Sequence, residues 1–257
     1  MGLMDYSAWV YVCAAVLLVG LLWLLFRRPK AKEAAFVEQL VAVPVQMEEL
    51  LSPPIAAVLS LVNEPPTDSW ETIKSSPDLS IYRKKTGDSP VAIVKATALI
   101  NDVSCENIMQ VIWDVHVRAT WDTVMKSFQE VEVHSPDSSV ITFFVKPPVP
   151  FVAARDFVQL RSRQKVGNAI IIAYQSVDRP DVPLADRCIR GNTIISGYRI
   201  EQKSPNQCEV AFISQTDIKG LIPVALLNTV APIRAAEWLK KMGLAAKGLE
   251  QRDLKTQ

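Results

Sequence analysis

The chain has 257 residues, of which 49% are apolar and 21% are charged. This length fits one large domain or two small ones, and the apolar fraction excludes a disordered chain. The 28 basic and 27 acidic residues nearly balance, which argues against a protein that follows a nucleic-acid backbone. Four scattered cysteines, Cys13, Cys105, Cys188 and Cys208, indicate neither a disulfide scaffold nor a zinc module. We therefore predict no metal, no cofactor and no nucleic-acid partner.

The N-terminal region contains an uncharged apolar run from residue 6 to residue 26. As a helix it would be about 31 Å long, which is close to the hydrocarbon thickness of a bilayer. A cleavable signal peptide would carry its positive charge before the run, but here Arg27, Arg28, Lys30 and Lys32 follow it. A buried core helix, the other alternative, would rarely lack a polar face over so many residues. We predict a single transmembrane anchor over residues 6–26.

The basic residues after the run predict the side of the membrane on which the rest of the chain lies. Positive charge next to an apolar span favours the cytosolic side, so we expect the remainder of the protein to face the cytosol. The endoplasmic reticulum is the favoured organelle. Residues 27–44 are expected to be a basic tether, and the soluble domain is expected over residues 45–250.

From residue 70 onward the pattern alternates between strand-like segments and turn signals. The segments are rich in Val, Ile, Phe, Tyr and Thr, and short breakers separate them, which predicts an antiparallel sheet. The expected strands are 79–85, 91–100, 139–146, 156–164, 169–177, 192–201 and 208–216.

Two helices are expected among these strands. The first starts near Ser104, a plausible N-cap with Glu106 in the first turn. The second covers residues 224–249, where apolar residues recur every three to four positions. A curved antiparallel sheet wrapped around one long C-terminal helix predicts an α+β fold that encloses an apolar cavity.

Four short motifs follow one another in this region: RATWD at 118–122, KPPVPFVAARDF at 146–157, CIR at 188–190 and DIKGLIP at 217–223. In these motifs and their spacing, residues 70–249 resemble the START lipid-transfer domains. Finer details resemble the phosphatidylcholine transfer protein subgroup of that family. The resemblance implies a helix-grip fold with a lipid in the cavity.

The resemblance also implies a role for Arg118, which stands where the phosphatidylcholine carriers contact the lipid phosphate. A guanidinium suits this role because it stays charged and offers a planar fork of donors. The alternative is a local ion pair with Asp122, four residues further along a helix. The two interpretations are compatible, because Asp122 can hold Arg118 when the pocket is empty.

Three further positions align with the aromatic residues that surround choline in the same subgroup. They are Ile112, Phe144 and Ile194, and only one of them is aromatic. A quaternary ammonium is attracted mainly to ring faces, so this departure argues against choline selectivity and leaves phospholipid binding open.

Sterol carriers of the family bury an acidic residue against an arginine. Arg161 matches the arginine, but the aligned acidic position is Thr142. A buried Arg161 then needs a ligand group or another residue to neutralise it, so the resemblance favours phospholipid over sterol. The alternative is that Arg161 faces outward from its strand.

Two segments are candidates for the opening through which a lipid passes. The first is the loop 146–154, whose stiff apolar tip contains Val149, Pro150 and Phe151; the alternative is a loop packed on the domain. The second is the C-terminal helix, which would cover the cavity with an apolar stripe. Its expected members are Leu227, Val230 and Trp238, with Gly220 and Pro223 as the hinge.

The sequence carries no GxSxG, HExxH or phosphate-binding glycine loop, and we predict a protein that is not an enzyme. The expected function is that of a membrane-anchored protein that extracts one lipid, a phospholipid, and moves it between membranes. The alternatives are a tethered lipid sensor and a carrier of sterol or another lipid; a cyclase-like enzyme on the same fold is less favoured. The lipid and the membrane are the expected partners, and the sequence does not identify a protein partner.

Overall fold

The computed structural model describes residues 52–146 and 152–256. The predicted anchor (6–26), the predicted tether (27–44) and the predicted loop tip of Val149, Pro150 and Phe151 lie outside the described residues. Among the helices that are described, none is long and apolar enough to cross a membrane.

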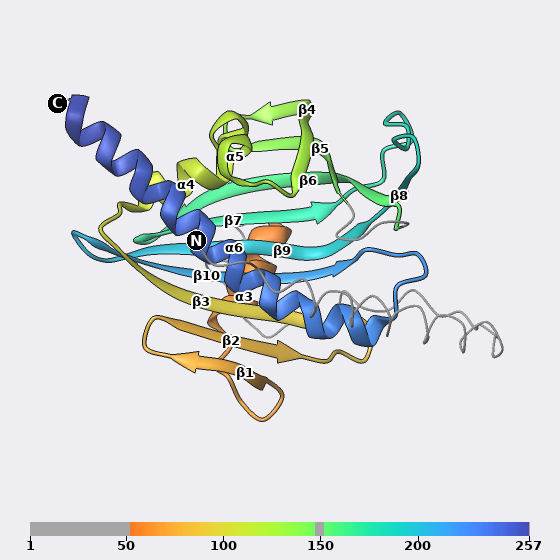
Figure 1. Ribbon diagram of the computed structural model, residues 1–257, viewed down its shortest axis with the longest axis horizontal. Helices are drawn as coiled ribbons and strands as arrows, with labels where there is room; N and C mark the ends of the chain where they lie inside the picture. Colours follow the sequence, from red (N-terminus) through yellow and green to blue (C-terminus); the bar gives the residue numbers. More distant parts are fainter. Residues whose placement is uncertain (1–51, 147–151, 257) are drawn as a thin grey trace, which may run out of the picture. The chain divides into compact units, whose positions relative to one another are not determined.

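The described residues form one ten-stranded sheet with the order β1-β2-β3-β10-β9-β7-β6-β5-β4, and β8 pairs beside β6 (Figure 1). All pairs are antiparallel except β6 with β8. The strands are β1 (Glu71–Ser76), β2 (Leu79–Lys84), β3 (Ile93–Asn101), β4 (Met125–Ser135), β5 (Ser138–Val145), β6 (Ala154–Val166), β7 (Ala169–Ser176), β8 (Cys188–Arg190), β9 (Asn192–Ser204) and β10 (Gln207–Asp217). The predicted antiparallel α+β fold is confirmed.

Four helices are described: α3 (Pro53–Asn63), α4 (Cys105–Trp113), α5 (Val115–Trp121) and α6 (Val224–Thr256). α6 crosses one face of the sheet, and α3 lies on the opposite face (Figure 1). Ser104 caps α4 as expected, since its Oγ accepts from the backbone N of Asn107 at 3.3 Å. α5 is a separate helix that the sequence analysis did not distinguish, because Asp114 ends α4 and caps the next helix.

The two faces of the sheet carry separate hydrophobic cores. The core of the inner face packs under α4, α5 and α6, and its fully buried members include Ile112, Ile141 and Met242. The core of the outer face packs under α3 and includes Val58 and Ile213. Because successive side chains of a strand point to opposite faces, the choice of face for each position follows from the strand register.

A buried lysine attaches the end of α3 to the outer face. Lys95 of β3 is 5% exposed, and its Nζ donates to the carbonyl oxygens of Glu64 at 2.5 Å and Leu61 at 3.4 Å. These carbonyls have no partner within the helix, so a cation is favourable there. Burial lowers the pKa of Lys95 to about 8, which shows that its position has a cost for the charged form.

α6 continues through Pro232 because another residue donates a hydrogen bond to the carbonyl that proline leaves without a donor. Proline has no N–H to donate to the carbonyl four residues earlier, which belongs to Asn228. Arg83 Nη1 of β2 donates to that oxygen at 2.8 Å. The Asn228 side chain also accepts from Ala92 N at 2.8 Å and donates to Pro90 O at 3.1 Å. The first part of α6 is therefore attached to the β2–β3 region.

Gly197 allows α3 to approach the sheet closely. A Cβ at this position of β9 would lie 2.3 Å from the carbonyl oxygen of Ile172 and 2.6 Å from Val58 Cγ2. We expect Gly197→Ala to lower the free energy of unfolding by about 2–3 kcal/mol, because backbone must move to make room. Gly87→Ala is the control, since no atom lies within 4 Å of the added Cβ. Equal denaturation midpoints for the two variants in urea would contradict this packing.

Candidate functional site

Arg118 forms a buried ion pair at the end of α5. Asp114 starts this helix, with its Oδ1 accepting from the backbone N of His116 and of Val117. Arg118 Nε donates to Asp122 Oδ2 at 3.2 Å, and the two residues are 9% and 6% exposed. The ion pair expected at this helical spacing is therefore present, and both charges lie inside the domain.

One aromatic ring lies over the guanidinium, and further rings continue from it across both layers. Trp238 of α6 has its ring centroid 5.7 Å from Arg118 Cζ, and it packs against Trp121 and Tyr198 at centroid distances of 5.1 Å each. Tyr198 in turn packs edge-on against Tyr174, 6.2 Å away. The site thus combines a helix end, two strands and α6.

Arg118 stays charged in this site, and the Tyr174 hydroxyl is a hydrogen-bond donor without a partner among the described residues. Burial alone would lower the pKa of Arg118, but Tyr174, Tyr198 and Asp122 outweigh it and raise the pKa. The Tyr174 hydroxyl is buried without a hydrogen-bond partner among the described residues, which is unusual for a buried polar group. A guanidinium and a free phenol within an apolar wall can bind one oxygen-rich group of a ligand.

The structure does not gather the three predicted cage positions around one ligand group. Ile112 is fully buried in the core of the inner face. Phe144 pairs with Asp156, and the neighbouring Phe143 carries the inward side chain, so Phe144 points to the outer face. Ile194 is half-buried at a bulge of β9. The rings near Arg118 come instead from other positions, of which the sequence analysis named only Trp238.

Arg161 is buried on the inner face, and its carboxylate partner is Glu130, which does not stand at the aligned position 142. Its Nη2 donates to Glu130 Oε1 at 2.7 Å, its Nε to Ser139 Oγ at 2.8 Å and its Nη1 to the Trp113 carbonyl at 2.6 Å. Thr142 pairs with Val158, which places its side chain on the opposite face. The outward-facing alternative for Arg161 is wrong, since its side chain is only 4% exposed.

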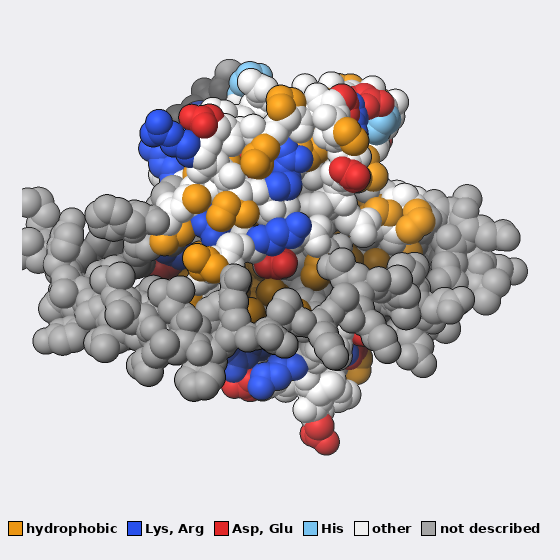
Figure 2. Space-filling model, turned by 90° about the vertical axis from the view of Figure 1, so that its right-hand side faces the viewer, with side chains coloured by type: hydrophobic (Ala, Val, Ile, Leu, Met, Phe, Trp, Pro, Cys, Tyr) orange, Lys and Arg blue, Asp and Glu red, His pale blue; other side chains and the backbone are white. Residues whose placement is uncertain are grey.

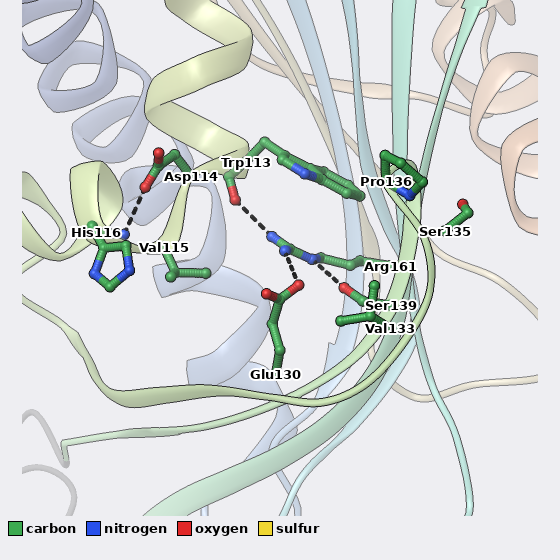
Figure 3. Close-up of a pocket in the computed structure, with 10 residues that line it drawn as sticks. All are labelled: Trp113, Asp114, Val115, His116, Glu130, Val133, Ser135, Pro136, Ser139 and Arg161. Atoms are coloured by element: carbon green, nitrogen blue, oxygen red, sulfur yellow. Dashed lines mark hydrogen bonds and ion pairs between the residues drawn. The ribbon is translucent and has the colours of Figure 1, made fainter.

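Arg161 borders a pocket among the described residues with a volume of about 320 Å³. Figure 3 shows the guanidinium between the Trp113 ring, Glu130 and Ser139. The ring centroid of Trp113 is 4.0 Å from Arg161 Cζ. The pocket lies between the α4–α5 junction and the β4–β5 hairpin, and its lining is Trp113, Asp114, Val115, His116, Glu130, Val133, Ser135, Pro136, Ser139 and Arg161.

The second pocket lies beside Arg118 and measures about 40 Å³, which is close to the space of one water molecule. Its lining includes Asp122, Met125 and Phe128. The inner face under α6 is filled with side chains such as Leu239 and Met242. The described residues therefore form a closed site at Arg118, where a lipid-sized cavity was expected.

Gly220 belongs to a tight loop held by a buried arginine. Its φ is +81°, and an added Cβ would lie 2.8 Å from Arg155 Nη2, so glycine is required for both reasons. Arg155 donates to the carbonyls of Ile218 and Lys219 at 2.9 Å each, and burial lowers its pKa. These bonds connect the loop before α6 to the start of β6.

The expected lid residues lie in the loop before α6 and in the first half of this helix. The carbonyl of Pro223 accepts from the backbone N of Leu226 at 3.0 Å and of Leu227 at 3.2 Å. Leu227, Val230 and Trp238 are half-buried, so each retains some exposure along the helix. Whether Gly220 and Pro223 act as a hinge stays a prediction.

Comparison with known proteins identifies the family. The START domain profile matches residues 56–251. The chain belongs to the START domain family. Ceramide transfer protein of Mus musculus is 22% identical over 193 residues, covering 67% of this chain and 31% of that protein. START domain-containing protein 10 of Homo sapiens is 28% identical over 174 residues, covering 67% of this chain and 60% of that protein. The chain thus spans less than two thirds of the length of either relative.

Solved START structures share the fold. Human STARD10 matches with a TM-score of 0.71 and 23% identity, covering 86% of this chain and 88% of that one. Human StAR-related lipid transfer protein 5 matches with a TM-score of 0.70 and 17% identity, covering 79% and 96%. The expected helix-grip fold of the START family is confirmed.

The buried Arg118–Asp122 ion pair predicts a large effect of one substitution on the free energy of unfolding. Asp122→Ala leaves a buried guanidinium unpaired and also removes the acceptor Oδ1, to which Val124 N and Met125 N donate. We expect the free energy of unfolding to fall by about 3 kcal/mol. Asp137→Ala is the control, because it breaks a 2.6 Å ion pair with Arg163 in which the carboxylate is 62% exposed; its loss should cost less than about 1 kcal/mol. Urea denaturation measures both, and similar losses would show that the Arg118 pair is not effectively buried.

Proposed function

We propose that this START protein binds one phospholipid with its phosphate at Arg118 and transfers it between membranes. The observation that carries the proposal is the buried Arg118 under the Trp238 ring, in electrostatic contact with Tyr174, whose hydroxyl has no described partner. A phosphate accepts hydrogen bonds from both groups, and a guanidinium offers it two parallel donors. The protein needs no catalytic step for this function.

The closed site implies that binding requires α6 to separate from the sheet. The acyl chains then replace contacts that Trp238, Leu239 and Met242 make with the inner face. Burial contributes about 0.8 kcal/mol per methylene, so one acyl chain contributes on the order of 10 kcal/mol. Apolar burial therefore dominates the affinity, and Arg118 selects the headgroup. When the lipid leaves, Asp122 again neutralises the arginine.

One end of the fold is suited to contact a membrane during this exchange. Leu184 and Leu221 are 53% and 84% exposed, in loops that the start of β6 holds through Asp156 and Arg155. Figure 2 faces this end, where Lys and Arg side chains lie interspersed with hydrophobic ones on the described surface. Exposed apolar side chains enter the interface, and nearby cations favour anionic headgroups. The predicted loop tip of Val149, Pro150 and Phe151 belongs to the same proposal.

A phosphate-free lipid related to ceramide is the second candidate. The similarity to ceramide transfer protein favours it, and so does the ion pair of the buried Arg161 with the more exposed Glu130, which lines the same pocket. Such a pair can exchange hydrogen bonds with hydroxyl and amide groups of a neutral lipid. The same pair gives Arg161 the carboxylate that Thr142 does not provide. Binding of a sterol is therefore less unfavourable than the aligned Thr142 alone indicates.

A transfer assay with the full chain in donor vesicles separates these candidates. The variant Arg118→Gln/Asp122→Asn keeps a polar pair without burying an unpaired charge. We expect it to slow the transfer of labelled phospholipid about tenfold or more, since it loses charge-assisted hydrogen bonds to the phosphate. Transfer of labelled ceramide by this variant should be unchanged or faster.

The control for this assay is Arg234→Gln, which removes an exposed arginine of α6 whose ion pair with Glu237 is at the surface. It should leave both rates unchanged, and circular dichroism should show that both variants are folded. Normal phospholipid transfer by Arg118→Gln/Asp122→Asn would refute the phosphate role. Transfer of ceramide but not of phospholipid by the natural protein would establish the second candidate.

We further propose that residues 6–26 anchor this activity in a membrane with the START domain on the cytosolic side. An anchor restricts transfer to membranes within reach of the tether and raises the local concentration of donor lipid. The full chain should stay in the membrane pellet after a carbonate wash, whereas a chain that starts at residue 45 should be released. Protease added to sealed microsomes should remove a label placed after residue 257; protection of the label would reverse the proposed orientation.

A further inference from the structure

Two thiols of the inner core lie in contact, although they are 103 positions apart in the sequence. Cys105 is the first residue of α4, and Cys208 is in β10. Their Sγ atoms are 3.1 Å apart. The residues are 6% and 0% exposed, and nothing in the proposed lipid site uses them.

We propose that Cys105 and Cys208 form a redox-sensitive pair that a small peroxide converts into a disulfide linking α4 to the sheet. Disulfide sulfur atoms are about 2.05 Å apart, so the pair must close by about 1 Å. Cys105 lies at the first turn of a helix, where one residue can shift without breaking a strand ladder. The oxidant must be as small as hydrogen peroxide because both thiols are buried.

The two thiols differ in a way that assigns the order of the reaction. The hydrogen bond from Cys208 lowers the pKa of Cys105, although burial opposes this. The same contact and burial raise the pKa of Cys208. Since the thiolate is the nucleophile, Cys105 reacts first and Cys208 resolves the product.

The chemistry balances in two steps. The Cys105 thiolate attacks one oxygen of hydrogen peroxide, the O–O bond breaks, and hydroxide leaves with the thiol proton as water. The resulting sulfenic acid is attacked by the sulfur of Cys208, the S–S bond forms and the S–O bond breaks. The hydroxide that leaves takes the Cys208 proton and becomes a second water. Two thiols lose two electrons in total, and the peroxide gains them.

The position of the pair connects it to α6. Ser104, the residue before Cys105, donates through its N and Oγ to Glu250 Oε2 at 3.1 Å each. Asn107 Nδ2 donates to the same oxygen at 2.7 Å. One carboxylate therefore holds the later part of α6 to the first turn of α4. A disulfide fixes that turn to β10, and we expect it to restrict the separation of α6 from the sheet.

The test uses the full chain, reduced and then titrated with hydrogen peroxide. After denaturation, the remaining thiols are alkylated and the peptides are analysed by mass spectrometry. We expect a Cys105–Cys208 linked peptide with a mass lower by two hydrogen atoms, the loss of two alkylatable thiols, and recovery of both with dithiothreitol. Cys188→Ala, a thiol on β8 away from the pair, should leave this result unchanged.

Three outcomes would contradict the proposed redox pair. They are oxidation of Cys105 to sulfinic acid without a link, a link of either residue to Cys13 or Cys188, and no reaction before the domain unfolds. The variant Cys208→Ala gives an independent check that does not require the link. It should accumulate a Cys105 sulfenic acid that dimedone labels, more slowly than the natural protein forms its link, because the hydrogen bond that lowers the pKa of Cys105 is lost. Absence of this label at saturating peroxide would also count against the proposal.

The effect on α6 rests on the proposed lipid transfer and is measured separately. Hydrogen exchange of α6 amides should slow after oxidation of the natural protein and stay constant in Cys208→Ala. Lipid transfer should fall on oxidation and return with dithiothreitol. A link with unchanged exchange would refute the restriction of α6. Slower exchange in a protein that transfers no lipid would leave the redox pair standing and refute the proposed function.

Discussion

The permanent positive charge of Arg118 inside the apolar core is the constraint to which the rest of the site responds. A buried guanidinium cannot shed its proton, so its surroundings must compensate it. Asp122 does so from one helical turn away, and the face of Trp238 adds a second attraction from α6. Arg118 therefore connects the short helix, the sheet and the long helix at one point. A ligand that brings its own negative charge competes directly with Asp122, so binding and closure of the domain are alternatives for the same donors.

The two faces of the sheet differ in how firmly their helices are held. On the outer face, Gly197 lets α3 pack against backbone, and Lys95 holds the last carbonyls of that helix. On the inner face, α6 packs through side chains and is attached by polar contacts at Asn228 and Glu250. Backbone contact through a glycine leaves little room for movement, whereas side-chain contacts can be exchanged for those of an acyl chain. The proposed separation of α6 therefore concerns the inner face, while the outer face keeps its backbone contact.

Local patterns predicted the fold and part of the site, and contacts between distant segments accounted for the rest. Seven strands, the Ser104 cap and the Arg118–Asp122 pair depend on residues within a few positions of one another, and all are present. β4 was missed because its edge position leaves most side chains exposed. Phe144 and Thr142 lie on the face opposite Arg161, and an alignment of motifs does not show this, because a shift of one position in a strand reverses every side chain. Glu130 could not be recognised as the partner of Arg161 because two intervening strand pairings bring them together.

The two attachments of α6 determine how it can move. Pro232 frees the Asn228 carbonyl for Arg83, and Glu250 binds the first turn of α4, with about 33 Å of helix between the two points. If α6 separates from the sheet as proposed, release of one attachment would leave the other as a pivot, and the helix need not separate in one step. If the Glu250 contact breaks first, the displacement of α6 would be greatest at its C-terminal end and smallest near the loop before the helix. A substitution of Arg83 would release the other attachment instead and reverse that geometry, which in the proposed function changes the side from which a lipid leaves.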